Sequence, residues 1–158
     1  MLKPPLQPML LGVRKEPFNS REYIFEFKWD GYRCLAFIDK GKLFLQSRNK
    51  KDLTPCFPEF KKLPDQLKTD SLILDGEICM LNDQGHPSFE ALQGIIGSVK
   101  KRNRKNASLI VWDILAVNQK NIFSRTLMER KEVLNQMISE SSLLIKSPYI
   151  RKKGQELY

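Results

Sequence analysis

The stretch Lys28-Trp29-Asp30-Gly31-Tyr32-Arg33 places a lysine, an acid, a glycine and an arginine directly after an apolar segment. Residues 23–28 alternate with the period of a β-strand, so Glu26 and Lys28 are expected on the same face. The glycine permits a tight turn after that strand. The sequence therefore predicts that a candidate nucleophile, Lys28, and a candidate orienting carboxylate, Asp30, lie within reach of one pocket.

Lys28 can act as a nucleophile only if its amine loses its proton. A lysine with the reference pKa of about 10.4 is protonated at neutral pH. Burial and nearby positive charge lower the pKa of such a group, and Arg33 or a bound metal could supply the charge. Taken alone, the six residues are more typical of an exposed lysine before an ordinary Asp-Gly turn.

Alternating segments predict an α+β domain dominated by antiparallel strands around this turn. Strands are expected at 33–39, 42–47, 71–81, 108–116 and 143–150, and helical segments at 57–63, 87–96 and 126–138. Asp39-Lys40-Gly41 is typical of a hairpin turn, and Thr126-x-x-Glu129 of a helix capping box. The strand at 71–81 is interrupted by Asp75-Gly76-Glu77, and its period of two places Asp75 and Glu77 on one face.

The composition of the 158 residues, 41% of them hydrophobic, fits one ordinary domain with a real core. No apolar run approaches the roughly 18 residues of a membrane-spanning helix, and the N-terminus lacks the apolar core of a secretion signal. We therefore expect a cytoplasmic protein. The net charge of +9 favours a polyanionic partner, although each basic cluster, at 48–51 and 100–105, is equally consistent with a solvated loop.

The three cysteines, Cys34, Cys56 and Cys79, are far apart in the sequence. They form no C-x-x-C pair, so a zinc site is not expected. Reduced and mostly buried thiols are the simplest interpretation.

Further motifs follow the opening stretch in a fixed order. They are Ser47-Arg48-Asn49, Leu74-Asp75-Gly76-Glu77, residues 87–93, Trp112-Asp113-Ile114-Leu115 and Met128-Glu129-Arg130-Lys131. Each is weak alone, but together with Glu26 to Arg33 they form a specific ordered set that spans nearly the whole chain. The chain resembles the nucleotidyltransferase (adenylation) domain of ATP-dependent DNA ligases, and is most similar to the ligase domain of bacterial end-joining ligases.

The resemblance implies a role for each matched position. Lys28 would be the adenylylated nucleophile and Asp30 would assist it as a second catalytic residue. Glu26 would contact the adenine edge, and Trp112 would stack on the adenine face, where the family usually carries phenylalanine or tyrosine. The remaining implied roles are Arg33 on ribose or phosphate, Glu77 on the ribose hydroxyl and a metal, and Arg48, Lys50 and Lys51 on DNA.

The resemblance also implies an ATP-grasp-like nucleotidyltransferase fold and a three-step reaction. Lys28 would take AMP from ATP with the help of Mg²⁺, AMP would pass to a DNA 5′-phosphate, and the neighbouring 3′-hydroxyl would displace AMP. The expected setting is DNA repair and recombination. Nicked or broken double-stranded DNA is the expected partner, and the Ku protein is a candidate partner in end joining.

The sequence departs from the family after its last matched motif. The E-G-x-x-x-K motif, the motif with two phosphate-binding lysines and the oligonucleotide-binding domain are not found in the 158 residues. We therefore expect residues 1–158 to be part of an adenylylation domain truncated at its C-terminus, with residues 1–21 as an extended lead-in. Two alternatives stay open: a catalytically incomplete nucleotide- or DNA-binding module, and an RNA ligase or capping guanylyltransferase, which share the lysine motif.

Overall fold

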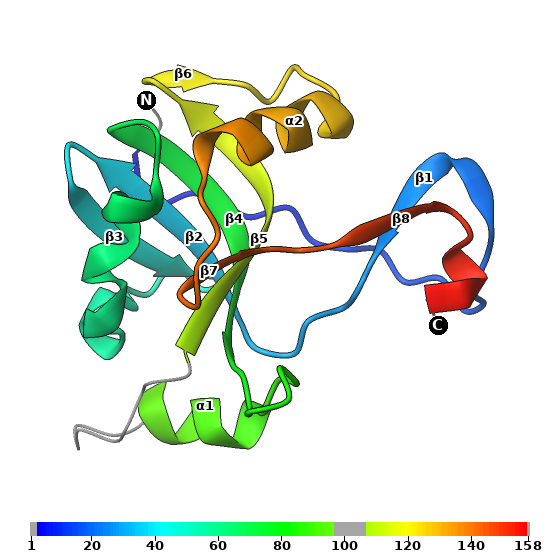
Figure 1. The fold of residues 1–158 in the computed structure, drawn as a ribbon, viewed down its shortest axis with the longest axis horizontal. Helices are drawn as coiled ribbons and strands as arrows, with labels where there is room; N and C mark the ends of the chain where they lie inside the picture. The colour runs from blue at the N-terminus through cyan, green and yellow to red at the C-terminus, as the bar shows by residue number, and fades with distance from the viewer. Residues whose placement is uncertain (1–2, 97–106, 158) are drawn as a thin grey trace.

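A six-stranded sheet forms the body of the computed structural model, which describes residues 3–96 and 107–157 (Figure 1). Its strands are β2 (Tyr32–Asp39), β3 (Lys42–Ser47), β4 (Ser71–Met80), β5 (Ala107–Val117), β6 (Lys120–Asn121) and β7 (Leu144–Lys146). The order is β3-β2-β4-β5-β6, and β7 pairs with β5. Only the β5–β7 pair is parallel among the described strands, so the predicted α+β class with mainly antiparallel strands is confirmed.

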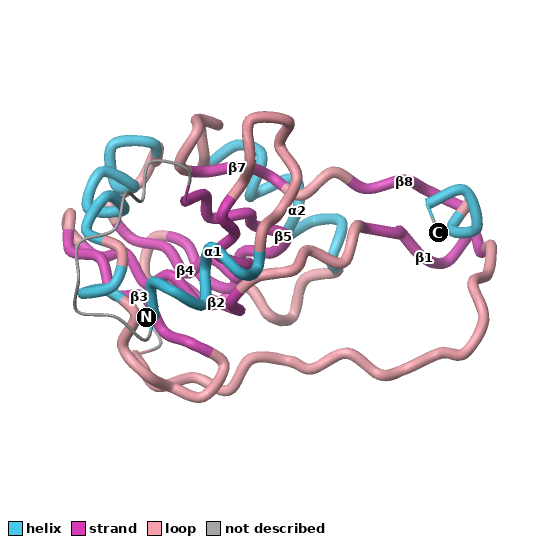
Figure 2. The backbone as a smooth tube through the Cα atoms, turned by 90° about the horizontal axis from the view of Figure 1, so that it is seen from below, coloured by secondary structure: helices cyan, strands magenta, loops and turns pink. Residues whose placement is uncertain are grey.

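A two-stranded arm projects from this body (Figure 1). It consists of β1 (Ser20–Glu26) and β8 (Tyr149–Lys152), which pair antiparallel, followed by the 3-10 helix η3 (Gly154–Leu157). Residues 3–19 contain no helix or strand and run as a long loop toward β1 (Figure 2). Two short linkers, 27–31 and 147–148, connect the arm to the body, and the linker 27–31 carries Lys28.

The main core lies on one face of the six-stranded sheet. The segments η1 (Thr54–Cys56), η2 (Pro58–Gln66) and α1 (Phe89–Ile96) bury apolar side chains against it, as does α2 (Leu127–Met137). Phe57, Phe60 and Leu63 are almost fully buried, so the predicted helical spacing is confirmed, although the turn is a 3-10 helix. A smaller cluster on the opposite face contains Leu35 and Ile73, with Leu6 packed against it.

Two local predictions are confirmed in detail. The hairpin between β2 and β3 turns at Lys40 and Gly41, whose φ angles of 49° and 76° are those that a tight two-residue hairpin turn requires. The capping box is also present, because the Thr126 side chain accepts from the Glu129 N–H and the Glu129 carboxylate accepts from the Thr126 N–H.

The predicted single strand at 143–150 is wrong, because the chain changes sheets at Ser147-Pro148. The Ser147 N–H donates to the Val111 carbonyl at 2.8 Å and closes the pairing of β7, while Pro148 has no N–H to continue a ladder. β8 then pairs with β1 in the arm. The strand β6 and the helix η3 were not predicted.

The predicted interruption of the strand at 71–81 is also wrong, since β4 runs unbroken through Asp75-Gly76-Glu77. Irregularities in the pairing with β5 lie between Ile73 and Leu74 and between Asp75 and Gly76. A Cβ atom at Gly76 would lie 2.2 Å from the Ile110 carbonyl oxygen. Glycine is therefore required here by the close approach of β5, and the Asp-Gly pair is no turn.

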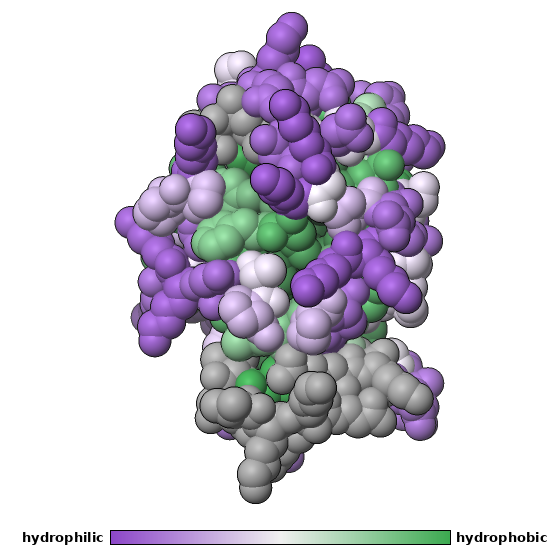
Figure 3. Space-filling view, turned by 90° about the vertical axis from the view of Figure 1, so that its left-hand side faces the viewer, coloured by the Kyte–Doolittle hydropathy of each residue, from purple (hydrophilic) through white to green (hydrophobic). Residues whose placement is uncertain are grey.

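The remaining expectations concern surface and composition. No helix in residues 3–96 or 107–157 is long and apolar enough to cross a membrane. Cys34 and Cys79 are buried and Cys56 is half-buried. Hydrophilic residues surround a small apolar area on the face seen in Figure 3. The basic cluster at 100–105 and the predicted helix stop at Gly97 lie outside the described residues.

Candidate nucleotide-binding site

Strands β2 and β4 bring Arg33, Asp75 and Glu77 together at one end of the sheet. Arg33 lies opposite Glu77 in the strand register. Its guanidinium donates two hydrogen bonds to Asp75, from Nε at 2.6 Å and from Nη2 at 2.7 Å. Burial raises the pKa of Asp75 above its ordinary value, and the Arg33 hydrogen bonds oppose that shift. The cation expected to bind ribose or phosphate is therefore already held by a buried partner.

Trp112 on β5 lies beside this pair. The Arg33 guanidinium carbon is 4.6 Å from the centroid of the Trp112 ring, which is within range for a cation–π interaction. A second contact of Arg33 reaches the carbonyl oxygen of Met9 in the N-terminal loop at 3.3 Å. The aromatic residue predicted to stack on a base thus has Arg33 over its ring.

The linker that carries Lys28 is held close to β4 by Gly31. A Cβ atom at Gly31 would lie 2.2 Å from the Ile78 carbonyl oxygen, so only glycine permits this approach. The Gly31 N–H also lowers the pKa of the Glu77 carboxyl, against the effect of burial. Lys28 and Asp30 are exposed. The strand predicted at 23–28 ends earlier than expected, at Glu26, so Lys28 lies two residues beyond β1 in an open linker.

Glu26, at the end of β1, forms an ion pair that the sequence did not predict. Its Oε1 accepts from the Lys131 ammonium at 2.7 Å, although the two residues are 105 positions apart. Lys131 also donates to the Trp112 carbonyl at 2.9 Å. The available signal was the position of Lys131 three residues before Leu134, since both side chains are buried on α2. A polar residue on the buried face of a helix indicates a specific partner.

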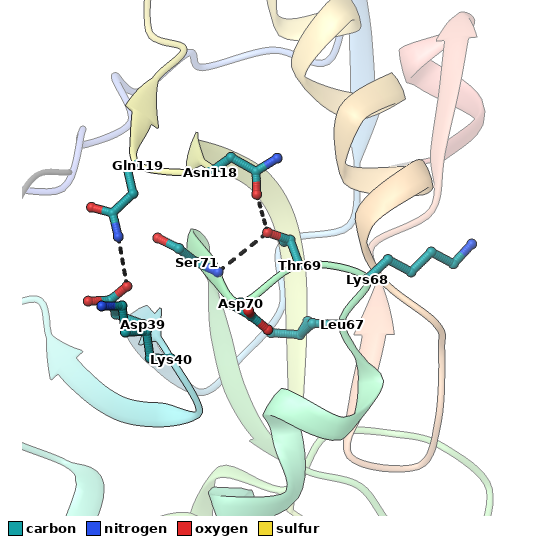
Figure 4. A pocket seen from close by; sticks show the side chains of 9 residues that line it. All are labelled: Asp39, Lys40, Leu67, Lys68, Thr69, Asp70, Ser71, Asn118 and Gln119. Atoms are coloured by element: carbon teal, nitrogen blue, oxygen red, sulfur yellow. Dashed lines mark hydrogen bonds between the residues drawn. The ribbon is translucent and has the colours of Figure 1, made fainter.

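An open hollow of about 470 Å³ adjoins the arm and the linker, and its lining includes Glu26 and Lys28. A second hollow, of about 530 Å³, lies near the other ends of β2 and β4, where Asp39 pairs with Ser71 (Figure 4). Its polar side chains bind one another: Gln119 donates to Asp39 at 2.9 Å, and Thr69 donates to Asn118. We therefore assign the second hollow to turn packing. The first hollow shares Glu26 and Lys28 with the candidate site, but Arg33, Glu77 and Trp112 do not line it, so the candidate site is defined by the side-chain contacts and not by this hollow.

The predicted DNA-binding residues lie on the turn after β3. Arg48, Lys50 and Lys51 are all exposed, and the Ser47 hydroxyl accepts from the Lys51 N–H at 2.9 Å. Ser47 lies opposite Cys34 in the register, next to Arg33. The turn therefore sits at the same end of the sheet as Arg33 and Glu77.

Comparison with known proteins identifies the family. The family model for the ATP-dependent DNA ligase domain matches residues 8–153. This chain belongs to that family. It is 36% identical over 132 residues to the SPbeta prophage-derived DNA ligase-like protein LigB of Bacillus subtilis, covering 84% of this chain and 47% of that protein. It is 33% identical over 144 residues to DNA ligase C of Mycobacterium tuberculosis, covering 87% and 39%.

Solved structures of the family share the fold. The ligase domain of Mycobacterium tuberculosis LigD matches with a TM-score of 0.65 at 25% identity, over 84% of this chain and 42% of that one. Mycobacterial DNA ligase D in complex with ATP matches with a TM-score of 0.67 at 24% identity, over the same shares. The chain thus spans about half or less of the length of these relatives, and the predicted nucleotidyltransferase fold is confirmed.

Glu77, at the candidate site, has a pKa raised toward neutral pH. Burial raises the pKa of Glu77 to about 7 from 4.5, against the attraction of Arg33, the Gly31 N–H and Lys28. A carboxyl group whose pKa is raised by folding binds its proton more tightly in the folded state, so its contribution to stability falls between pH 4.5 and about 7.

Replacing Glu77 with glutamine should remove this contribution. Relative to E77Q, the unmodified protein is expected to lose unfolding free energy as the pH rises from 5 to 7.5. Urea unfolding at several pH values measures it. A difference that stays constant over that interval would contradict the raised pKa.

Proposed function

We propose that this chain recognises ATP and accepts AMP on Lys28, as the nucleotide-binding part of an ATP-dependent DNA ligase. The observation that supports the proposal is a continuous set of contacts in a member of this family. Glu26 is linked through Lys131 to the backbone of Trp112, Trp112 meets Arg33, and Arg33 lies opposite Glu77. Lys28 and Asp30 lie on the linker between Glu26 and this strand pair.

In the proposed reaction the Lys28 amine attacks the α-phosphorus of ATP. A nitrogen–phosphorus bond forms, the bond to the β-phosphate oxygen breaks, and pyrophosphate leaves while the amine loses a proton. Glu26 and Trp112 hold the base, Arg33 and Glu77 hold the ribose and phosphates, and Asp30 orients the amine. Positioning and charge neutralisation supply most of the catalysis in phosphoryl transfer.

Mg²⁺ is the metal that this reaction would use, and the carboxylates of the site fit it. Mg²⁺ keeps several waters and is bound by one or two carboxylates together with substrate phosphates. Glu77 would hold the ion, with Asp30 facing the same region, as the electrostatic influence of Asp30 on the Glu77 pKa indicates. When bound, the metal neutralises charge on the phosphates of ATP.

The later steps are proposed for the whole protein. AMP passes from Lys28 to a DNA 5′-phosphate held by Arg48, Lys50 and Lys51. The neighbouring 3′-hydroxyl then attacks that 5′-phosphate, loses its proton and releases AMP, which seals the break in repair and recombination. The net charge of +9 favours such a polyanionic partner. In this proposal the protein acts on the nucleoid in the cytoplasm, with Ku as a candidate partner. Residues 1–158 are part of one adenylylation domain, and residues 1–21 form its lead-in segment.

Incubation with α-labelled ATP and Mg²⁺ tests the first step. Label attached to the protein, released by acid as expected for a phosphoramidate, together with one pyrophosphate per adduct, would support the proposal. GTP in place of ATP separates it from a capping-type guanylyltransferase, and nicked DNA against nicked RNA separates it from an RNA ligase. Absence of any adduct in the protein that contains all family motifs would reject it.

A second function, nucleotide binding without chemistry, is favoured by one observation. Lys28 is exposed on the open linker, so the residues that the structure describes do not enclose its amine. Calorimetry with AMP detects binding without turnover. Binding with no adduct from ATP would identify these 158 residues as a recognition module.

A further inference from the structure

Lys131 is a charged side chain buried in the interior, with 4% of its side chain exposed. Three groups surround its ammonium. It donates to Glu26 Oε1 at 2.7 Å and to the Trp112 carbonyl oxygen at 2.9 Å, and it lies 5.1 Å from the centroid of the Tyr149 ring. Burial of an ammonium is costly unless its hydrogen bonds are satisfied, so the two acceptors offset much of the cost of burying Lys131.

The partners of Lys131 come from three different elements. Glu26 ends β1, Trp112 lies in β5 and Tyr149 begins β8, while Lys131 itself is on α2. The ammonium therefore ties both strands of the arm to the body at the level of the candidate site. A second tie, from Trp29 Nε1 to Ser147 Oγ at 3.0 Å, joins the two linkers beside it.

The contact fixes one oxygen of Glu26 and leaves the other available. Oε1 is taken by Lys131, whereas Oε2 has no protein hydrogen-bond partner among the residues that the structure describes. An ionised carboxylate only accepts hydrogen bonds. The group on the base that faces this oxygen must therefore be a hydrogen-bond donor. The amino group at purine C6 is a donor, whereas a carbonyl oxygen at C6 would place a second acceptor against Glu26.

We infer that Lys131 is a positioning residue that selects a 6-aminopurine, by holding the Glu26 carboxylate as a fixed acceptor at the edge of the nucleotide site. This inference rests on the proposed function, because it assumes that the base lies beside Glu26. Without Lys131 the carboxylate loses the partner that sets its rotamer and can turn away into solvent. Selection between bases is then lost even where the fold is kept.

AMP and IMP are suitable probes because they differ at C6 and neither can transfer AMP to Lys28. Calorimetry of the unmodified chain is expected to show AMP bound at least about tenfold more tightly than IMP, the effect of one hydrogen bond to a charged group. K131M should bring this ratio toward one. K131R, which keeps the charge and the donors, should keep most of the preference, and K131Q, which keeps a donor without the charge, should fall between them.

R130M is the matched control. Arg130 is the neighbour of Lys131 on α2, and its ion pair with Asp113, at 2.8 Å, does not touch Glu26. This variant should lower the melting temperature and leave the AMP-to-IMP ratio unchanged. If circular dichroism shows that K131M does not fold, the AMP-to-IMP ratio of K131Q is compared with that of the unmodified chain instead.

The outcomes separate this inference from the proposed function. An AMP preference that survives in both K131M and K131Q would overturn the role of Lys131, while AMP binding itself would still support the proposed site. If the AMP-to-IMP affinity ratio changed as much in R130M as in K131M, Lys131 would act only by stabilising the fold and not by positioning Glu26. Failure of the unmodified chain to bind AMP or form an adduct would overturn the proposed function, and this inference with it.

Discussion

Replacing Lys28 with arginine should abolish transfer of AMP from ATP to the protein. Arginine keeps a positive charge on the linker but remains protonated, so it offers no lone pair to phosphorus. The loss should be complete within detection, whereas affinity for AMP should change little because the base and ribose contacts are intact. α-labelled ATP with gel detection measures the adduct, in the longest form of the protein that labels.

Two control variants test whether the loss of labelling is specific to Lys28. K120R alters an exposed lysine on β6, away from the candidate site, and should label normally. D30N should label more slowly without losing the adduct, since Asp30 orients the amine and does not form the bond. An adduct that persists in K28R would place the nucleophile on another residue and remove the basis of the proposed mechanism.

The sequence predicts the local elements of this fold well because their causes are local. The turn at Lys40-Gly41 needs positive φ, and the capping box at Thr126 needs Glu129 three residues later. The course of residues 143–150 could not be predicted in the same way. Its break at Pro148 depends on two different partner strands, β5 and β1, that lie far away in the sequence.

For the candidate site too, the sequence predicts residue identities better than it predicts their contacts. The motifs locate Glu26, Arg33 and Glu77, because residue type and order within short stretches carry that information. What each side chain touches depends on packing: the Glu26–Lys131 pair joins residues 105 positions apart, and the exposure of Lys28 depends on where β1 ends. These contacts hold Glu26 and Arg33 in place, while Lys28, the proposed nucleophile, lies in an open linker.

Replacing Asp75 with alanine should be among the most destabilising substitutions in the sheet. Asp75 and Arg33 have 7% and 18% of their side chains exposed and share two hydrogen bonds. Removing the carboxylate leaves the guanidinium partly buried without a counter-charge, which costs about 3–5 kcal/mol for a buried pair. Urea unfolding measures this loss. E156A, which breaks the exposed Lys153–Glu156 pair, should change the unfolding free energy by an amount close to zero.

The double variant R33M/D75L distinguishes the cause of the loss. If the cost of D75A comes from the uncompensated arginine, replacing both partners with apolar side chains should recover much of the stability. The same double variant should lose affinity for AMP, because the cation beside Trp112 is gone. A double variant as unstable as D75A would instead mean that the aspartate supports the irregular pairing of β4 with β5 through its own backbone position, independently of Arg33.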